Sequence, residues 1–532
     1  MNIFSAPCAP HERARVQRLL CVTFLPLVAA YVIAGLLTLH NDHYWGDDWA
    51  QYVGHARNIA QGTPYSDTGY LFNPSAASIG PAVSQPGLPA LLAPVYALFG
   101  QNLLALKATE FFLLCGGIAL AAIVLTDSFG VTAGLLAAEL FALHPAVLWL
   151  RQIIITEPPF ILFSFLAIFL AERRWRGSTR LHEFSYAILA GLALLAAFAT
   201  RKVALALLAA IVLSDLVKRR RLLVGTVPLV AIFAAGALLL QGAEVAADYS
   251  TQLHYESSPQ SADFPLLSTL WKQVTGYLAA LGEIVPMPFR LSTLAATVLF
   301  LLASVGVIIT CWKTHDTASS AWRSRLISGI ANCPLEVWYL GAYLAALIVL
   351  PVYPDVRLLL PILPIIFAAA IVGAGHLLAR TGRLFATNAV ILLVGLCIYV
   401  TVLQIHAEKG ALRLRADSGE GENGAFCSDC KGMYAFIAAA TPPDARVAFA
   451  KPRALALMTR RASWSWSRRA SEATTLATMR RLHISYVVVP REGYVLKPWY
   501  PDYFSWKHLA ARPDVSVVFA NNTFRIYLIN WG

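Results

Sequence analysis

Long apolar runs constrain this chain more than any other feature of its sequence. Between residues 17 and 404, runs of about 17–25 residues with few charges recur, and each is long enough to cross the hydrocarbon core of a bilayer. Inside lipid, every backbone N–H and C=O has to be paired within its own segment, so such runs form helices. Only 14% of the 532 residues are charged, against about a quarter in soluble domains. The sequence therefore predicts a polytopic α-helical membrane protein.

Short basic loops between the runs predict an orientation. By the positive-inside rule, loops such as "HERARVQR", "ERRWRGSTR" and "CWKTHDTASSAWRSR" are cytoplasmic. The first apolar run is longer than a signal-peptide core and no cleavage site follows it, so we expect it to be retained. Alternating sides gives about eleven spans, with the N-terminus inside and the C-terminus outside. The predicted spans are 17–39, 103–126, 131–150, 155–172, 185–200, 202–217, 222–241, 291–312, 336–351, 358–379 and 384–404.

Two long stretches, 40–102 and 243–290, fall on the outer side of this map. In the first, apolar residues recur at helical spacing from Trp49 to Ala60, and Gly62 stops the pattern, which predicts an amphipathic helix at the interface. The segment 88–100 is apolar but short, so it predicts a helix at the membrane surface, and the span count is open by about two on its account. The second stretch contains the polar, irregular run "DYSTQLHYESSPQSADFP".

The pattern changes after residue 405. The runs "ARVAFAKP", "ISYVVVPR" and "VSVVFANNTFRIYLIN" are typical of short strands. We therefore expect a transmembrane domain over 1–406, which includes the first outer loop 40–102, and a small extracytoplasmic α/β domain over 407–532. Cys427 and Cys430 form a lone CxxC without a second pair to complete a zinc site. A local disulfide and a redox-active pair are both open.

The net charge of +12 does not indicate nucleic-acid binding, because the basic residues lie in scattered loops rather than on one folded surface. The sequence also lacks a P-loop, HExxH, GxSxG and a dinucleotide-binding fingerprint. No clear set of metal ligands stands out, although a divalent cation stays possible as a cofactor.

Unusual charges gather at the predicted outer helix ends. Each has a structural alternative: Asp48 as an N-cap, Arg201 and Lys202 as side chains that snorkel to headgroups, and Arg357 as the partner of Asp355. Glu157 beside an apolar run is harder to dismiss, since acidic residues there are rare and usually functional. The set is Asp47, Asp48, Arg151, Glu157, Arg201, Lys202, Asp355 and Arg357.

Carboxylates beside cations suit a substrate that carries a phosphate and a hydroxyl. A basic pair at a helix end binds phosphate through charge and N–H donors, and a carboxylate accepts the proton of an alcohol as a general base. Without a nucleotide-binding motif, the expected phosphate is that of a lipid reached from within the bilayer.

These segments resemble the polyprenyl-phosphate-sugar-dependent glycosyltransferases of the GT-C fold, in particular the dolichyl-phosphate-mannose–protein mannosyltransferase-like and aminoarabinose-transferase-like branch of bacteria. The resemblance covers nearly the whole chain. The segments that carry it are "DDWAQYVGHARNIAQG", "QPGLPALLAPVYALFG", "HPAVLWLRQIIITEPPFILF", "GLALLAAFATRKVAL", "YPDVRLLLPILP" and "YAFIAAATPPDARV".

The resemblance implies roles for individual residues. In the family's Asp-Glu-x-x-Tyr pattern, aligned on Tyr52 and Arg57, the catalytic Asp falls on Asp48 and the second acid on Trp49, which is a departure. It implies that Asp47 is the helper carboxylate and that Glu157 is the second acidic site. For the lipid-phosphate donor it implies a site made of Arg201, Lys202, Arg357, Tyr52, Arg57 and Gln85, the last in place of the family's Lys or His.

The expected function is an inverting glycosyltransferase that moves a sugar from a polyprenyl phosphate to an acceptor hydroxyl, on a lipid, glycan or protein, at the outer face of a bacterial inner membrane. A transporter or flippase of sugar-lipids is the alternative. It should place charges near the midplane of two related halves, whereas here they lie at outer ends. A third hypothesis, a non-catalytic assembly partner, predicts that Asp48 and Glu157 tolerate substitution by Ala.

Overall fold

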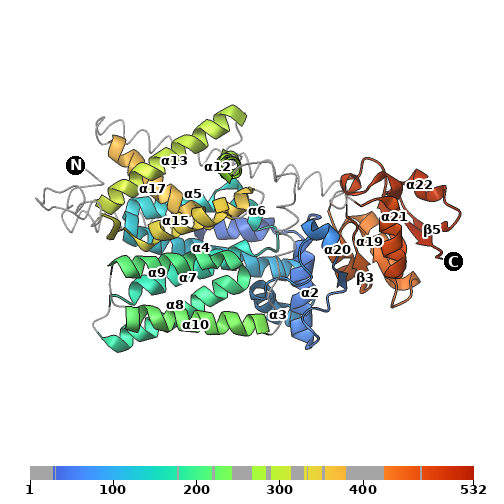
Figure 1. Cartoon of the computed structure of the whole chain (residues 1–532), viewed down its shortest axis with the longest axis horizontal. Coiled ribbons are helices and arrows are strands. Elements are labelled where there is room, and N and C mark those ends of the chain that lie inside the picture. The colour runs from blue at the N-terminus through green and yellow to red at the C-terminus, as the bar shows by residue number, and fades with distance from the viewer. Residues whose placement is uncertain are drawn as a thin grey trace, which may run out of the picture.

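The computed structural model describes residues 28–29, 31–176, 179–218, 222–242, 266–282, 289–312, 329–331, 333–349, 354–378, 424–467 and 470–531. A helical bundle carries a smaller C-terminal domain at one end, and helices α2 (Asp48–Gln61) and α3 (Gly87–Phe99) lie where the two meet (Figure 1). We call the end of the bundle beside the C-terminal domain the domain-facing end, and the opposite end the far end.

Most helices of the bundle coincide with predicted spans. Residues 31–38 are helical and fall in the first predicted span, whose beginning lies outside the described residues, as does the whole span 384–404. The described helices of the bundle are α4 (Leu103–Phe129), α5 (Val131–Ala142), α6 (Pro145–Leu150), α7 (Glu157–Arg173), α8 (Arg180–Thr200), α9 (Leu205–Lys218), α10 (Leu222–Gly242), α12 (Leu266–Gly282), α13 (Phe289–Trp312), α15 (Leu335–Val349), α16 (Val356–Leu359) and α17 (Leu363–Leu378), with a 3-10 turn η2 (Lys202–Ala204) before α9.

Two features of the bundle differ from the predicted map. The span 131–150 is broken, because Pro145 cannot continue α5; instead it begins α6, and the His144 side chain caps that helix by accepting a hydrogen bond from the Ala146 N–H over 3.1 Å. Helix α12 was not predicted within 243–290, and the polar run quoted there lies outside the described residues.

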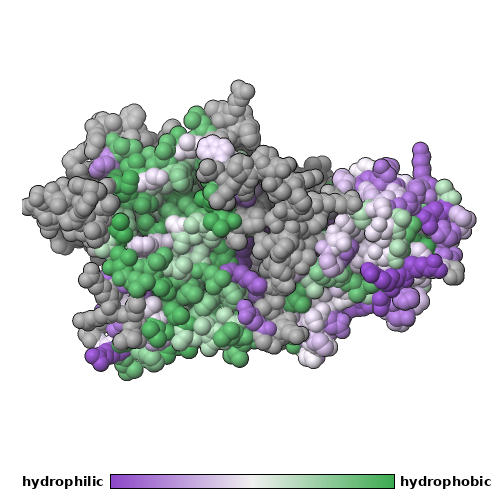
Figure 2. Space-filling model, in the orientation of Figure 1, coloured by the Kyte–Doolittle hydropathy of each residue, from purple (hydrophilic) through white to green (hydrophobic). Residues whose placement is uncertain are grey.

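The apolar surface of the bundle agrees with a membrane protein. By length and composition, three described helices can cross a membrane: Leu103–Phe129, Arg180–Thr200 and the Val224–Gln241 part of α10. Shorter apolar helices accompany them, among them Leu335–Val349 and Leu363–Leu377. Hydrophobic residues cover much of the visible face of the bundle, whereas the C-terminal domain is largely hydrophilic (Figure 2).

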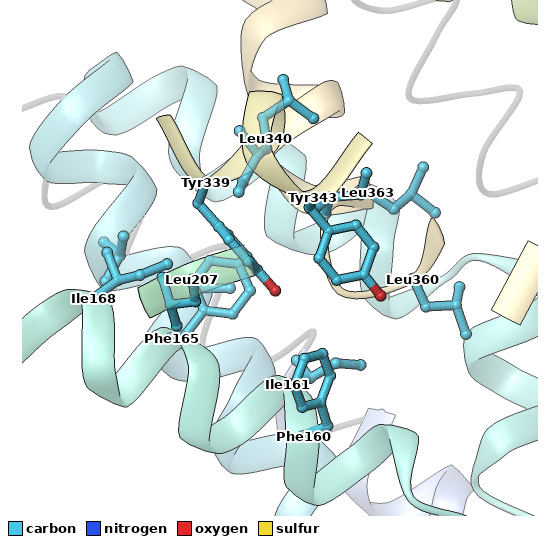
Figure 3. Packing of buried hydrophobic residues seen from close by; sticks show 14 of the residues in the cluster. Phe160, Ile161, Phe165, Ile168, Leu207, Tyr339, Leu340, Tyr343, Leu360 and Leu363 are labelled. Atoms are coloured by element: carbon cyan, nitrogen blue, oxygen red, sulfur yellow. The ribbon is translucent and has the colours of Figure 1, made fainter. Parts of the chain in front are cut away.

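Close packing holds the bundle together. Tyr339 and Tyr343 project from α15 toward Phe160 and Phe165 of α7, and all four side chains are buried (Figure 3). Small residues let other helices approach: a Cβ on Gly373 of α17 would lie only 3.0 Å from the backbone nitrogen of Gly306 in α13. In lipid, such van der Waals contact replaces the hydrophobic effect as the force between helices.

The far end contains a buried ion pair of its own. Arg174 binds the carboxylate of Asp215 and donates to the Gly225 carbonyl over 3.1 Å. Thr226 donates to the same carboxylate over 2.7 Å. Arg174 lies at the end of α7, Asp215 in α9, and Gly225 and Thr226 in α10. These hydrogen bonds therefore hold the three helices together.

The C-terminal domain is built on a mixed sheet, so the predicted α/β fold is confirmed. The strands follow the order β1-β3-β2-β4-β6-β5, and β5 and β6 are antiparallel to their neighbours while the others are parallel. The strands are β1 (Tyr70–Leu71), β2 (Arg446–Ala448), β3 (Ala462–Trp464), β4 (Ile484–Pro490), β5 (Val515–Ala520) and β6 (Phe524–Ile529). The helices of the domain are α19 (Ser428–Ala440), α20 (Pro452–Thr459), α21 (Glu472–Arg481) and α22 (Trp506–Ala510).

The first outer loop takes part in this domain. Strand β1 belongs to that loop, and its Tyr70 pairs with Ser463 of β3. Trp45 and Trp49 lie in the same hydrophobic core as Phe449 and Tyr494, and Trp45 Nε1 donates to the Tyr494 hydroxyl over 3.0 Å. The boundaries 1–406 and 407–532 stay predictions, but the sheet and the core both cross them.

Two disulfides occur among the residues that the structure describes. Cys427 and Cys430 form a disulfide at the start of α19, which agrees with the local disulfide, one of the two alternatives left open for the CxxC. Cys311 and Cys333, at the far end, are also paired. The thiol pool of the cytoplasm keeps cysteines reduced, so this disulfide does not fit the cytoplasmic side that the charge rule predicts for the loop, and we assign the pair no role.

Candidate active site

An ion pair between two helix ends forms the base of the site. Glu157 is the first residue of α7, where Pro158 and Pro159 follow without N–H groups to satisfy. Arg201 follows the last residue of α8, and its Nη1 lies 2.6 Å from Glu157 Oε1. The Glu157 side chain is 2% exposed and that of Arg201 is 19% exposed. Among the described residues no hydrogen bond reaches Glu157 Oε2, so this oxygen can still accept a hydrogen bond.

A second cation lies beside this pair. Asp355 caps α16 by accepting from the Arg357 N–H over 2.8 Å, and its other oxygen lies 3.1 Å from Arg357 Nε. Burial opposes the charge of Arg357, but Glu157 and Asp355 together raise the pKa of its guanidinium. The effect of Glu157 on Arg357 shows that the two helix-end motifs lie within electrostatic range of each other.

Tyr44 connects this cluster to the first loop. Burial is the main factor that raises the pKa of the Tyr44 hydroxyl to about 12, and the nearby guanidinium of Arg357 opposes the rise. The carboxylates of Asp48 and Glu157 both add to it. Tyr44 therefore lies within electrostatic range of both Glu157 and Asp48, although it was not among the predicted site residues.

The two adjacent aspartates have different surroundings. Helix α2 begins at Asp48 and neither carboxylate caps it, so the structural alternative of Asp48 as an N-cap is wrong. Asp47 instead accepts from two backbone N–H groups of α20, those of Arg453 over 3.1 Å and Ala454 over 3.0 Å. Asp48 Oδ1 lies 2.7 Å from Arg453 Nη1, and the Asp48 side chain is 55% exposed. The cost of adjacent carboxylates is thus offset by a helix N-terminus and a guanidinium from the C-terminal domain.

Helix α2 determines which of its residues reach the site. Tyr52 follows Asp48 by one helical turn, so the two side chains share a face, and Tyr52 acts electrostatically on both Arg201 and Arg453. Arg57 lies nine residues after Asp48, on the opposite face. It is buried, its Nε donates to Asn58 Oδ1 over 3.2 Å, and burial and Arg460 lower its pKa. The structure does not bring Arg57 to the cations, so its proposed contact with the donor gains no support from its neighbours.

Trp49 faces inward, away from the exposed carboxylate of Asp48. It is buried, and its ring stacks on His43 at 4.7 Å and contacts Phe426 of the C-terminal domain at 5.6 Å. The position where relatives are expected to carry a second acid therefore belongs to the shared core. An acid there would be buried among rings.

The loop before α3 brings Gln85 to the end of α8. Gly87 packs so closely on α8 that a Cβ would lie 2.7 Å from the carbonyl carbon of Ala199. Gln85, two residues earlier, is buried, and neither polar atom of its amide has a hydrogen-bond partner among the described residues. Lys202 begins η2 directly after Arg201 and is partly buried. Both predicted residues thus border the Arg201 end of the cluster.

The rest of this loop is held by buried polar side chains of α2. His55 accepts from the Ser84 N–H through Nε2 over 3.1 Å, while its Nδ1 lies 2.7 Å from the Tyr65 carbonyl. Asn58 Nδ2 donates to the Asp67 carbonyl over 2.7 Å. Burial lowers the pKa of His55 to about 4, so the ring is neutral and keeps both hydrogen bonds at neutral pH.

Sequence reasoning missed Arg453 and Tyr44. Arg453 lies more than 400 residues from its partner Asp48, and only the Lys-Pro-Arg start of a helix marks its segment. Arg151 is buried at the end of α6. Within the described ranges, no three His, Cys, Asp or Glu side chains gather as a metal-ligand set, so we derive no step through a metal ion.

The arrangement of helices, first loop and C-terminal domain is that of the GT-C fold, which is found in glycosyltransferases that use polyprenyl-phosphate donors. The structure of ArnT from Cupriavidus metallidurans bound to undecaprenyl phosphate matches with a TM-score of 0.54 at 13% identity, over 95% of this chain and 97% of that one. The apo state of the same protein matches with a TM-score of 0.56 at 14% identity, over 95% and 98%.

A second solved structure is more distant and longer. AglB from Archaeoglobus fulgidus, an archaeal oligosaccharyltransferase in complex with an inhibitory peptide and a dolichol-phosphate, matches with a TM-score of 0.51 at 12% identity, over 87% of this chain and 69% of that one. No protein-family model and no curated protein sequence matches the chain. At these identities the likeness establishes the fold, and the reaction has to be argued from the site.

Proposed function

We propose that this protein is an inverting glycosyltransferase that moves a sugar from a polyprenyl phosphate to an acceptor hydroxyl. The reaction takes place at the outer face of a bacterial inner membrane, with the N-terminus cytoplasmic and the C-terminal domain periplasmic. The observation that carries the proposal is an exposed carboxylate, Asp48, at the same end of the bundle as two half-buried cations, Arg201 and Arg357. The fold shared with ArnT and AglB supports the same class of donor.

In the proposed reaction, Asp48 takes the proton of the acceptor hydroxyl as a general base. The hydroxyl oxygen attacks the anomeric carbon from the side opposite the phosphate, so the new C–O bond forms as the bond to the phosphate oxygen breaks. The polyprenyl phosphate leaves with the bonding electron pair. Arg201, Lys202 and Arg357 stabilise the negative charge that develops on it. No external oxidant, reductant or nucleotide is needed.

The other predicted residues support these steps. Glu157 is the counter-ion of Arg201 in the free enzyme and shares that guanidinium with the phosphate once the donor binds. Asp47, the proposed helper, fixes the start of α2 by holding the N-terminus of α20. Tyr52 and Gln85 border the donor, and the loop 64–86 held by His55 and Asn58 excludes water that would otherwise hydrolyse the donor.

The test is transfer from a radiolabelled polyprenyl-phosphate sugar in membranes that contain the protein. Asp48→Asn should lower the transfer rate by about 10²–10⁴, the range for loss of a general base. Asp444→Asn is the control, because Asp444 is an exposed aspartate outside the proposed donor and acceptor site and its substitution should leave the rate unchanged. Wild-type transfer by Asp48→Asn would refute the assignment of the base.

A second measurement separates catalysis from transport. If the wild-type protein moved the labelled sugar-lipid across a sealed bilayer without consuming it, the flippase alternative would replace the proposal. Mass spectrometry of cell-envelope lipids, glycans and proteins, with and without the gene, identifies the acceptor through the mass of the added sugar.

A further inference from the structure

Arg453 is a buried arginine whose side chain leaves the C-terminal domain and enters the first loop. Its side chain is 2% exposed, and it lies in α20. Nη1 donates to Asp48 Oδ1 over 2.7 Å, while Nη2 donates to the Pro81 carbonyl over 2.8 Å. Its backbone N–H donates to Asp47. One residue therefore links the C-terminal domain to the start of α2 and to the loop before α3.

The first loop is shaped to accept this guanidinium. The Arg453 Cζ atom lies 4.9 Å from the centre of the Tyr70 ring. Gly80 has a φ of +102°, and a Cβ at that position would lie 2.6 Å from Nη2. A glycine is therefore required twice, for its backbone conformation and for the space that the guanidinium occupies.

The contact is asymmetric, because the cation is buried and its carboxylate partner is not. The Asp48 side chain is 55% exposed although its Oδ1 atom is held by Arg453. An exposed aspartate alone samples several rotamers, whereas a bond from a fixed, buried guanidinium selects one of them. The hydrogen bond to Oδ1 links the Asp48 carboxylate to the C-terminal domain, while part of the carboxylate stays exposed to solvent.

We propose that Arg453 is a positioning residue for Asp48: it holds one carboxylate oxygen so that the other faces the acceptor hydroxyl. This inference rests on the proposed function, in which Asp48 is the general base. It makes the C-terminal domain a part of the catalytic geometry. The acceptor is then deprotonated within reach of α20.

The test is a double-mutant cycle on the full-length protein, with the labelled donor and, as the source of acceptor, a membrane extract from cells that lack the gene. Arg453→Gln should lower kcat about tenfold to a hundredfold, the scale expected when a reacting group is misplaced, with the KM for donor changed less than about twofold. In the Asp48→Asn background the same substitution should change the residual rate less than about twofold, because Arg453 acts through Asp48.

Arg453→Lys is the second variant, since it keeps the charge but offers no fork to hold Asp48 and Pro81 together. It should unfold at the wild-type temperature and still lose about fivefold or more in kcat. The control is Arg461→Lys, because among the described residues the Arg461 side chain donates to Thr441 and the Ala438 carbonyl, both within the C-terminal domain. It should keep the wild-type kcat.

Three results would overturn the inference: equal losses from Arg453→Gln with and without Asp48, a wild-type kcat for Arg453→Lys, or losses that follow a fall in thermal stability in both variants. Failure of the proposed function looks different. In that case the wild-type protein itself would transfer no sugar, and Asp48→Asn would have no effect to couple with.

Discussion

Asp47 should stabilise α20 from outside that helix, and this can be measured locally. Lys451 precedes α20 and its side chain makes no cap, while Pro452 occupies the first helical position. The next two N–H groups, of Arg453 and Ala454, are those that an N-cap side chain satisfies. The Asp47 carboxylate binds both of them. Asp47→Ala therefore removes the cap of a helix without altering the helix itself.

The size of the effect follows from two opposing terms. Loss of an N-cap side chain costs about 0.5–2 kcal/mol. Burial raises the pKa of Asp47 even though Arg453, Lys451 and the two backbone bonds oppose the rise, so desolvation offsets part of the gain from the charged acceptor. We therefore expect a loss of about 1 kcal/mol in the free energy of local opening, which accelerates amide exchange about fivefold.

Hydrogen–deuterium exchange of peptides that cover 453–459, in detergent at fixed pH, measures this directly. Asp47→Asn should show a smaller effect, since it keeps one acceptor oxygen. Asp444→Ala, an exposed aspartate of the same domain, should leave α20 unchanged. If Asp47→Ala left the exchange of these amides within twofold of the wild-type rate, the carboxylate would not be the cap of α20 and the reasoning would fail.

Two further predictions concern the bundle and the loop. Glu157→Gln leaves Arg201 without its counter-ion. Breaking a fully buried pair costs about 3–5 kcal/mol of stability, and because Arg201 is 19% exposed we expect a smaller loss of about 1–3 kcal/mol. The loss should appear as a lower Tm in detergent, and an unchanged Tm would show that the pair does not stabilise the protein. The pKa of His55 is lowered from 6.5 to about 4, mainly by burial. As the pH falls from 6.5 to about 4, His55 becomes protonated in the unfolded chain but stays neutral in the folded protein. The free energy of unfolding therefore falls by about 1.4 kcal/mol per pH unit. His55→Gln should flatten that decline in a Tm series from pH 7 to 4; an equally steep decline would assign the acid sensitivity to other groups.

The helices and their charged ends could be predicted because the information is local. A run of apolar residues long enough to span lipid has one stable conformation, and its ends have to lie at the same two surfaces as those of its neighbours. Glu157 and Arg201 therefore meet although they belong to different helices, and Arg357 lies within electrostatic range of Glu157. The break between α5 and α6 at Pro145 is also encoded locally, but the segments on both sides of it are apolar and therefore read as one span.

The contacts of the first loop could not be predicted in this way. Whether Tyr52 or Arg57 reaches the cations depends on how α2 is rotated about its axis, and the amphipathic pattern does not settle this, because buried residues, polar ones included, lie all around that helix. The pairing of β1 with β3 joins segments nearly 400 residues apart, and two-residue strands carry no periodicity. Arg453 belongs to the same class of contact, since only the folded chain places it against Asp48.

The shared sheet indicates that the C-terminal domain is not a separate binding module. A separate binding module would leave the first loop complete without it, with the two aspartates solvated at the start of α2. Instead Trp45 and Trp49 are buried in the core of that domain, and its α20 supplies the partners of both carboxylates. A chain that ended before this domain would expose those rings and leave Asp48 free to rotate. Asp48, the proposed base, therefore belongs to the same folded unit as the C-terminal domain, and the proposed function predicts that changes in acceptor choice arise close to Asp48 rather than on a distant face.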